Sequence, residues 1–292
     1  MRLNLLRGVD NLIKITADST CDLSPELLAE YDITLAPLHV LINEEDFLDG
    51  VNITPKDIFH YVGIENKTCS TAAINTYEYE QFFKPFTEQF DAVIHISLGV
   101  QFSSCHQNAQ LAAQEFSNVF VVDSQNLSTG SGHLVIEAAE LAKQGLGAEQ
   151  IVTQITALAS QVEASFIIDK MDYLKRGGRC SSIEAFGATL LKIKPSIEVL
   201  GGKMEVGKKY RGNFKGCLEK YIKDRLENRT DVDSSRIFIT HSECSDEVIE
   251  YVKSLVSEYV QFDEVHITKA GCTVSTHCGP NTLGILFKRK TN

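Results

Sequence analysis

The stretch LIKITADSTCDLSPELLAE at residues 12–30 sets the fold of the first half of the chain. Its apolar, β-rich run at 12–17 is typical of a buried strand, and the polar residues 18–20 end that strand. Ser24 then provides an N-cap and Pro25 suits the first turn of a helix, so a helix is expected to begin there. A strand, a polar loop and a helix in this order are typical of a parallel sheet covered by helices.

The same order recurs further along the first half of the chain. Apolar, β-branched runs predict strands, and a cap residue followed by helix-forming residues predicts each helix. The longest of these helices has Leu134, Ala138 and Leu141 on one face, as expected for a helix packed on a sheet. The expected strands are 34–41, 91–96 and 119–122, and the expected helices begin at Thr54-Pro55 and span about 103–114 and 128–143.

Three of the expected strands lead into short loops rich in Ser, Thr and Asp, at 18–20, 97–104 and 123–130. The carboxyl ends of parallel strands lie at one edge of an open sheet, so these loops are expected to converge there. We therefore predict a polar ligand site at that edge. The alternative is that these side chains only cap the helices that follow.

The sequence pattern changes after residue 168, where a cationic, Gly-containing turn at 173–179 follows a short apolar run. Two short strands around Gly201-Gly202 are typical of a hairpin. The remaining pattern predicts a mixed α/β unit, so we expect two domains, residues 1–165 and 166–292. In this half the expected strands are 196–199, 203–206, 236–240, 264–269 and 282–287, and the expected helices are about 182–191, 213–226 and 246–256.

With 292 residues, 43% of them hydrophobic, the chain can bury a substantial core. No apolar run approaches the roughly 18 to 20 residues that span a bilayer, and the N-terminus lacks the apolar centre of a signal peptide. We therefore expect a cytoplasmic protein. The eight cysteines are scattered along the sequence, and in a reducing compartment they are expected to remain thiols.

The charge of the chain is distributed unevenly. Residues 170–229 contain 15 Lys and Arg against 7 Asp and Glu, which is a net charge of +8. The whole chain has a net charge of −11, so the other residues together carry −19. This asymmetry indicates a site for an anionic ligand or partner. The acidic balance of the whole chain argues against a nucleic-acid-binding protein, because phosphate contacts need a broad cationic face.

The sequence contains no clear signature of catalysis, of a cofactor or of a metal site. Residues 130–132 lack the spacing of a nucleophile elbow, and residues 201–204 do not form a P-loop. His277 and Cys278 are adjacent, which is neither a usual pair of zinc ligands nor evidence for a thiol nucleophile. The remaining hydroxyls, arginines and histidine suit the binding of a carboxylate or phosphate. The alternative is an enzyme for small acyl or phosphorylated molecules, with His277 as acid or base.

The sequence resembles the DegV family of bacterial fatty-acid-binding proteins over nearly its whole length. The strongest match is the motif YLKRGGR at 173–179, with Lys194-Pro195 and Arg211 behind it. The resemblance implies an N-terminal α/β/α domain with a mainly parallel sheet and a mixed α/β C-terminal domain, with a long acyl chain buried between them. The other matching segments are 18–23, 122–124, 128–132 and 277–280, with Gly284.

The resemblance also implies which residues surround the head group of the ligand. Thr71 and Ser103 match the threonine and serine that hold the fatty carboxylate in the family. The segments around them depart from the common family pattern, with Ala72-Ala73 after Thr71 and Ser104 after Ser103. The positions implicated in phosphorylation of the lipid by a separate kinase correspond to Arg179, Arg211 and His277.

The function implied by the resemblance is that of a carrier rather than an enzyme. The protein would bind a long-chain fatty acid and present its carboxylate to a fatty acid kinase, which forms an acyl phosphate for phospholipid synthesis. A peripheral contact with the membrane during lipid exchange is compatible with this role. Burial of a chain of roughly 16 carbons, at about 0.8 kcal/mol per methylene, makes on the order of 10 kcal/mol available before association costs.

Overall fold

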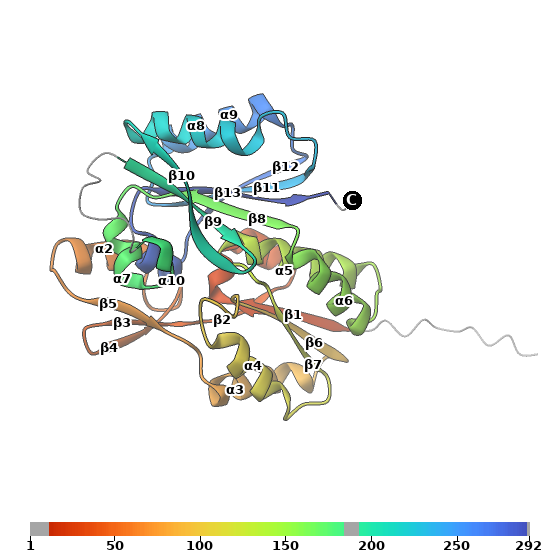
Figure 1. Ribbon diagram of the computed structural model, residues 1–292. Helices are drawn as coiled ribbons and strands as arrows, with labels where there is room; N and C mark the ends of the chain where they lie inside the picture. Colours follow the sequence, from red (N-terminus) through yellow and green to blue (C-terminus); the bar gives the residue numbers. More distant parts are fainter. Residues whose placement is uncertain (1–11, 184–192, 291–292) are drawn as a thin grey trace, which may run out of the picture.

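The computed structural model describes residues 12–183 and 193–290. Its elements form layers, which run from α3 and α4 on one side of the molecule to α8 and α9 on the other (Figure 1). A four-stranded sheet, the helices α5 and α6, and a six-stranded sheet lie between these outer helices. The helices of the layers are α3 (Thr76–Thr87), α4 (Cys105–Ala113), α5 (Thr129–Lys143), α6 (Ala148–Ala159), α8 (Phe214–Leu226) and α9 (Asp246–Tyr259).

The four-stranded sheet has the order β2-β1-β6-β7, and all its neighbouring strands are parallel. Its strands are β1 (Ile13–Asp18), β2 (Thr34–Ala36), β6 (Ala92–Ser97) and β7 (Val119–Asp123). After β1 come a short 3-10 helix at Ser19–Cys21 and α1 (Pro25–Glu30), where the Ser24 hydroxyl accepts a hydrogen bond from the Leu27 N–H at 3.4 Å. The predicted parallel sheet with helices on both faces is confirmed.

The six-stranded sheet has the order β10-β9-β8-β13-β11-β12, and only the pair β11 and β12 is parallel. The predicted mixed sheet of the second half is therefore confirmed. Strand β8 spans the expected boundary at 165 and 166 and belongs wholly to this sheet. The strands are β8 (Val162–Ile167), β9 (Ile193–Leu200), β10 (Lys203–Arg211), β11 (Val232–Ser242), β12 (Glu264–Lys269) and β13 (Thr282–Arg289).

Helix α5 lies between the two sheets and joins their cores (Figure 1). It packs against β1 and β6 on one side and against β8 and β13 on the other. Side chains all around the helix are therefore buried, among them Val135 and Ile136 as well as the predicted apolar face at Leu134. A single hydrophobic cluster consequently extends from the parallel sheet to residues of the mixed sheet such as Phe238.

The expectation of one strand over residues 34–41 is wrong. Pro37 separates β2, in the parallel sheet, from β3 (His39–Ile42), which belongs to a small antiparallel sheet of order β4-β3-β5. Proline has no backbone N–H to donate, so it interrupts a ladder at this position. The other strands of the small sheet, β4 (Glu45–Leu48) and β5 (Cys69–Ala72), follow no clear sequence pattern.

The small sheet lies next to three helices, α2 (Pro55–Gly63), α7 (Met171–Gly177) and α10 (Cys272–Cys278) (Figure 1). The expected turn at 173–179 is thus partly helical, since the turn begins only at Gly177-Gly178. Helix α10 was not predicted from the sequence. Of the helix expected at 182–191, only the short 3-10 segment Ser181–Ile183 falls within the described residues.

Within the described residues, no helix has both the length and the apolar character needed to span a bilayer. All eight cysteines lie in the described part of the chain, and none of them forms a disulfide.

Candidate ligand-binding site

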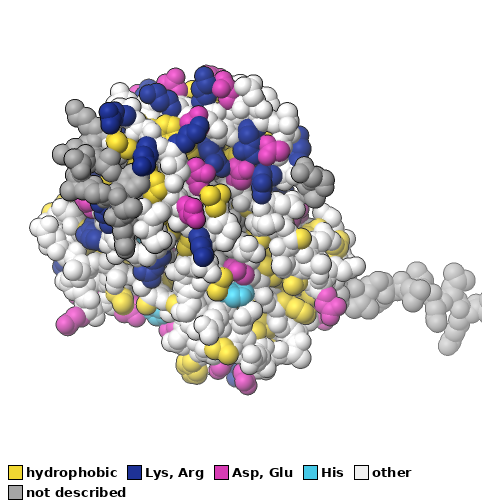
Figure 2. All heavy atoms as spheres, viewed as in Figure 1, with side chains coloured by type: hydrophobic (Ala, Val, Ile, Leu, Met, Phe, Trp, Pro, Cys, Tyr) yellow, Lys and Arg dark blue, Asp and Glu magenta, His cyan; other side chains and the backbone are white. Residues whose placement is uncertain are grey.

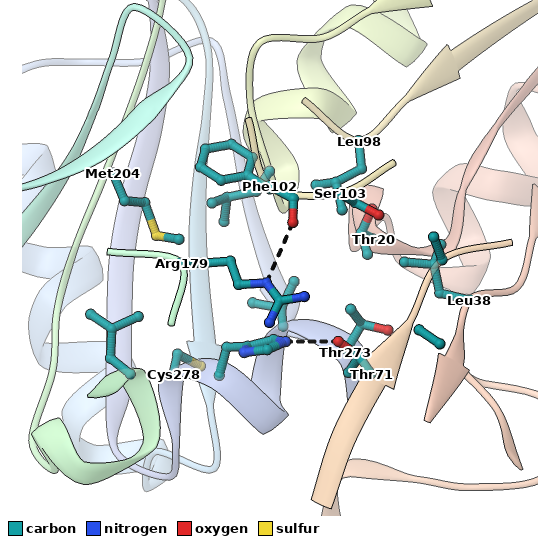
Figure 3. A pocket seen from close by; sticks show the side chains of 16 residues that line it. Thr20, Leu38, Thr71, Leu98, Phe102, Ser103, Arg179, Met204, Thr273 and Cys278 are labelled. Carbon is teal, nitrogen blue, oxygen red and sulfur yellow. Dashed lines mark hydrogen bonds between the residues drawn. The ribbon is translucent and has the colours of Figure 1, made fainter. Parts of the chain in front are cut away.

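The first cavity opens between the parallel sheet and the small helices α7 and α10 (Figure 3). It holds about 600 Å³ of space that protein atoms do not fill, part of which is open to solvent. Its walls include Thr20 after β1, Ser103 after β6 and Leu127 after β7. The loops at the carboxyl ends of these strands therefore converge on one site, as predicted from the parallel sheet.

Thr71 and His277 meet in the wall of this cavity, although 206 residues separate them in the chain. Thr71 belongs to β5 and His277 to the last turn of α10, and the Thr71 hydroxyl lies 2.8 Å from Nε2 of the imidazole. Burial of the ring, with a further effect of the Arg179 charge, lowers the pKa of His277 to about 4. The imidazole is therefore neutral near pH 7.

Arg179 supplies a positive charge to the same cavity (Figure 3). Gly178 ends α7 in the left-handed conformation, with φ of 64°, and this turn directs Arg179 toward the N-terminal half. The guanidinium donates a hydrogen bond from Nη1 to the Gly177 carbonyl at 2.7 Å, and its Nε lies 3.5 Å from the Phe102 carbonyl oxygen. Arg179 thus links the two halves at the cavity, and among the described residues these two contacts leave other N–H groups of its guanidinium for a ligand.

The double glycine also allows α7 and α10 to pack closely. A Cβ atom on Gly177 would overlap Nδ1 of His277, so no larger residue fits there without displacing the imidazole. The motif thus positions two residues of the cavity, Arg179 through the turn and His277 through the contact.

Ser103 lines the cavity and also helps to begin α4. Its hydroxyl accepts a hydrogen bond from the Cys105 N–H at 3.2 Å and lies 3.2 Å from the Cys105 sulfur. Both interpretations of the hydroxyl-rich loop, as cavity wall and as helix cap, therefore apply to this residue.

Of the five residues that the sequence indicated, Thr71, Ser103, Arg179 and His277 line the first cavity. Arg211 does not line it and is exposed at the end of β10. Two further hydroxyls in the wall, those of Thr20 and Thr273, were not singled out from the sequence. Thr20 falls in a loop that was predicted to face the site, whereas nothing in the sequence pattern indicated Thr273.

The second cavity adjoins the first and shares Leu127, Val274 and Cys278 with it. It holds about 380 Å³ and lies against β8, β11 and β13, with apolar walls at residues such as Phe166 and Leu286. The hydroxyls on its wall are hydrogen-bonded within the protein: Ser128 to Asp22, Thr240 to Thr129 and Thr268, Ser242 to Ser275, and Thr282 to the Cys278 carbonyl. An apolar group can occupy this space without leaving those hydroxyls unpaired.

Two carboxyl groups of the first half hold the start of α10. Oδ1 of Asp22 accepts a hydrogen bond from the Gly271 N–H at 2.8 Å. The two oxygens of Asp49 accept hydrogen bonds from the N–H groups of Cys272 and Thr273, at 2.8 and 3.1 Å. These bonds satisfy backbone donors that a helix leaves free at its first turn, and they fix the helix that carries His277.

The Asp22 bond predicts a pH dependence of stability. Burial, with a smaller effect of the Asp49 charge, raises the pKa of Asp22 to about 8. The folded protein therefore holds a proton that the unfolded chain releases near pH 4, so the free energy of unfolding falls as pH rises from 4 to 8, by about 1.4 kcal/mol per pH unit. Asp22→Asn can donate to Ser128 and accept from Gly271 with no charge. The free energy of unfolding of this variant, measured with urea, should not fall in this way. Its difference from wild type is therefore expected to increase by about 2–3 kcal/mol from pH 6 to pH 8, in favour of the variant.

Asp49→Asn is the control for this experiment. Both oxygens of Asp49 accept backbone N–H groups, and an asparagine offers only one oxygen, so this variant is expected to be less stable at every pH. If Asp22→Asn and wild type show parallel pH profiles, Asp22 is not protonated in the folded protein.

The cavity offers no activated thiol. Burial raises the pKa of the Cys278 thiol to about 12, and burial likewise raises the pKa of Cys105, next to Ser103, to about 11. Both thiols are therefore protonated near pH 7 and are poor nucleophiles. In the described part of the chain, no group of three or more His, Cys, Asp or Glu side chains is arranged to hold a metal ion.

Residues 12–290 match a family model described as "Uncharacterised protein, DegV family". A DegV domain-containing protein of Deinococcus radiodurans is 30% identical over 279 residues, which cover 94% of this chain and 98% of that protein.

Solved structures of bacterial proteins are similar over the same length. The structure that describes fatty acid binding of a DegV family protein from Thermus thermophilus is 28% identical, with a TM-score of 0.86 over 95% of this chain and 99% of that one. A stearic acid-binding protein from Eubacterium ventriosum is 26% identical, with a TM-score of 0.80 over 96% and 99% of the two chains. The family model and the fold agree over nearly the whole chain, and this protein is therefore a member of the DegV family.

Proposed function

We propose that this protein binds a long-chain fatty acid between its two halves. The observation that carries the proposal is that two different cavities adjoin. One has apolar walls, and the other has polar groups, those of Thr71, Ser103, Arg179 and His277. A fatty acid has the same division into a charged end and an apolar chain. The family relatives from Thermus thermophilus and Eubacterium ventriosum, which bind fatty acids, support the proposal.

The carboxylate is proposed to lie in the first cavity. The Thr71 and Ser103 hydroxyls can donate to its oxygens, and Arg179 offsets its charge. The neutral state of His277 leaves Arg179 as the main positive charge there. The chain then extends past Val274 into the second cavity, where burial of methylenes provides the larger part of the affinity.

We further propose that the protein is a carrier that presents its ligand to a separate, cytoplasmic fatty acid kinase. Arg179 belongs both to the cavity wall and to the exposed surface, so the head group lies where a docked enzyme can reach it. Figure 2 shows Lys and Arg side chains, mixed with acidic ones, on the half of the molecule that contains α8 and β10. Arg211, exposed at the end of β10, is proposed to contact an acidic surface of the kinase rather than the lipid.

Native mass spectrometry of protein purified from bacteria tests the binding proposal. Wild type is expected to carry a long-chain fatty acid. The double variant Thr71→Val/Ser103→Ala is expected to retain it about 10²- to 10⁴-fold less tightly, because it loses two hydrogen bonds to a charged group and each contributes about 1.5–3 kcal/mol. Ser104→Ala is the control, since Ser104 is exposed and makes no side-chain cap bond to α4.

Two results would count against the proposal. A wild-type protein that is free of lipid and takes up no long-chain acid does not have this function. Unchanged retention in the double variant, with the fold intact by circular dichroism, would mean that the carboxylate lies elsewhere.

A further inference from the structure

A third cavity lies between the two halves and, among the described residues, shares no wall residue with the two cavities of the proposed lipid site. It holds about 740 Å³ of space that protein atoms do not fill, part of which is open to solvent. The first half contributes the loop 125–126 after β7 and the end of α6, at Ala159. The second half contributes β8, the turn Gly201-Gly202 between β9 and β10, and the end of β13. A ligand in this cavity contacts both halves of the protein.

Three arginines of the described chain line this cavity, and carboxylates hold two of them on both sides. Arg225 and Arg229 donate hydrogen bonds to Glu163, which lies in the same wall. Glu198 binds Arg225 from β9, and Asp231 binds Arg229 through two hydrogen bonds. These two arginines therefore stabilise the packing of α8, and of the segment after it, on the mixed sheet.

The third arginine, Arg289, keeps an unused donor. Its Nη2 donates to the Ser160 carbonyl at 2.8 Å, and its Nε lies 3.5 Å from Oε1 of Glu163. Its Nη1 makes no hydrogen bond to a described residue, and 45% of the side chain is exposed. Because Glu163 is shared with two other arginines, the positive charge of Arg289 is only partly offset.

Asn126 brings a second unused donor, from the other half of the protein. The residue is 2% exposed, and its Oδ1 accepts a hydrogen bond from the Leu127 N–H at 3.3 Å. Its Nδ2 donates to no described residue, although buried polar groups in proteins are usually paired. Glu163 cannot serve as its acceptor, because three arginines already surround the two oxygens of that carboxylate. The acceptor for Asn126 is therefore expected to come from a ligand.

We infer that the third cavity is a second ligand site, which binds the carboxylate or phosphoryl group of a small organic molecule. Arg289 donates to this oxyanion from the mixed sheet and Asn126 donates from the loop after β7, so each half supplies one donor. Both oxyanions accept several hydrogen bonds, and a guanidinium binds them well. The buried side chains of Val162 and Val199 in the same wall accommodate an apolar part of the molecule.

This site adjoins the proposed lipid site along the chain. Asn126 precedes Leu127, which lines both of the first two cavities, and Gly202 lies two residues before Met204, which lines the first. The turn at Gly202 also approaches the loop after β7, since a Cβ atom there would lie 3.7 Å from Cβ of Gln125. A molecule in the third cavity therefore holds together segments of the two halves that also form the lipid site.

Isothermal titration calorimetry of the full chain tests the site with two probes, phenyl phosphate and benzoate, which present different oxyanions on the same ring. We expect saturable binding of at least one of them, and the tighter probe identifies the group that the site prefers. Arg289→Gln and Asn126→Asp should each lower the affinity about 10- to 100-fold, because each removes a hydrogen bond to a charged group. Asn126→Asp keeps the oxygen that accepts from Leu127 and places a repelling charge at the site.

Lys290→Gln is the matched control. It removes one positive charge next to Arg289, but Lys290 does not line the cavity and its Nζ donates to the Thr230 carbonyl at 3.2 Å. Its affinity for both probes should equal that of wild type. Nuclear magnetic resonance spectra of wild type locate the bound probe, since the backbone amide signals of Gly201 and Gly202 are expected to shift during the titration.

Three results would contradict the inference. A wild-type protein that binds neither probe has no such site. Unchanged affinity in Arg289→Gln, with the fold intact by circular dichroism, would place the probe elsewhere, for example beside Arg179 in the first cavity. An equal loss in Lys290→Gln would show a general effect of charge. None of these measurements uses a fatty acid, so their failure leaves the proposed function to be judged by its own test.

Discussion

Replacing Val274 with phenylalanine is expected to lower the affinity for a 16-carbon fatty acid by at least about 10³-fold. Val274 lies where the two cavities meet and lines both of them, together with Leu127 and Cys278. A phenyl ring at this point would close the passage. If about six methylenes no longer enter the second cavity, at about 0.8 kcal/mol each, the loss is about 5 kcal/mol, which corresponds to between 10³ and 10⁴ in affinity.

The measurement is a series of dissociation constants for saturated acids of increasing length. In wild type, affinity should rise with each methylene until the second cavity is full. In Val274→Phe it should stop rising at the length that reaches residue 274, so short acids are affected far less than long ones. Val274→Ala, which widens the junction, is the control and should preserve the dependence on length. Parallel series for wild type and Val274→Phe would show that the chain does not pass this residue.

The layered fold was predictable from the sequence because strands and helices of the first half follow local rules. Capping residues such as Ser24 and apolar runs such as 12–17 act within a few positions, and the helix and the strand that they predicted are confirmed. Helix α5 shows the limit of these rules. Its pattern indicated one apolar face, but the structure places a sheet on each side. No local pattern in the helix indicates the second sheet, whose first strand begins only at Val162.

The candidate site was predictable only in part, for a related reason. Thr20 and Ser103 lie at carboxyl ends of parallel strands, where topology alone requires polar loops to meet. Thr71 and His277 come together through an edge strand and a seven-residue helix rich in small polar residues, and neither element has a clear apolar period. Their pairing depends on the packing of α10 against α2, α7 and β5. Family resemblance, not periodicity, indicated these two residues.

The polar groups that follow the parallel strands have two different roles. Asp18, the last residue of β1, is not among the residues that line the first cavity. Its carboxylate accepts hydrogen bonds from the Leu98 N–H at 2.7 Å and from the Tyr79 hydroxyl at 2.5 Å, and His95 lies 3.1 Å from it. Asp18 thereby fixes the loop after β6 to the carboxyl end of β1. Thr20, two residues further on, faces the cavity. The prediction of a polar edge was sound, while the division into structural and ligand-facing groups required the structure.

Gly279→Ala is expected to cause the largest loss of stability among glycine substitutions at this site, about 2–6 kcal/mol. Gly279 follows α10 with φ of 75° and ψ of 173°, a conformation found almost only in glycine. A Cβ atom there would also lie 2.6 Å from Cδ2 of Tyr173, whose buried ring packs against Phe59. Backbone strain and ring overlap therefore add, and each costs about 1–3 kcal/mol.

Gly178→Ala separates these two causes. Gly178 also has a positive φ, of 64°, but no atom lies within 4 Å of the position that its Cβ would take. Only the left-handed backbone is then disfavoured, at about 1–2 kcal/mol. The free energy of unfolding, measured with urea, should thus be highest for wild type, lower for Gly178→Ala and lowest for Gly279→Ala. Because Tyr173 belongs to α7 and Gly279 ends α10, Gly279→Ala should also displace His277 and weaken ligand retention. Equal losses of stability in both variants would mean that overlap with the Tyr173 ring does not contribute to the loss in Gly279→Ala.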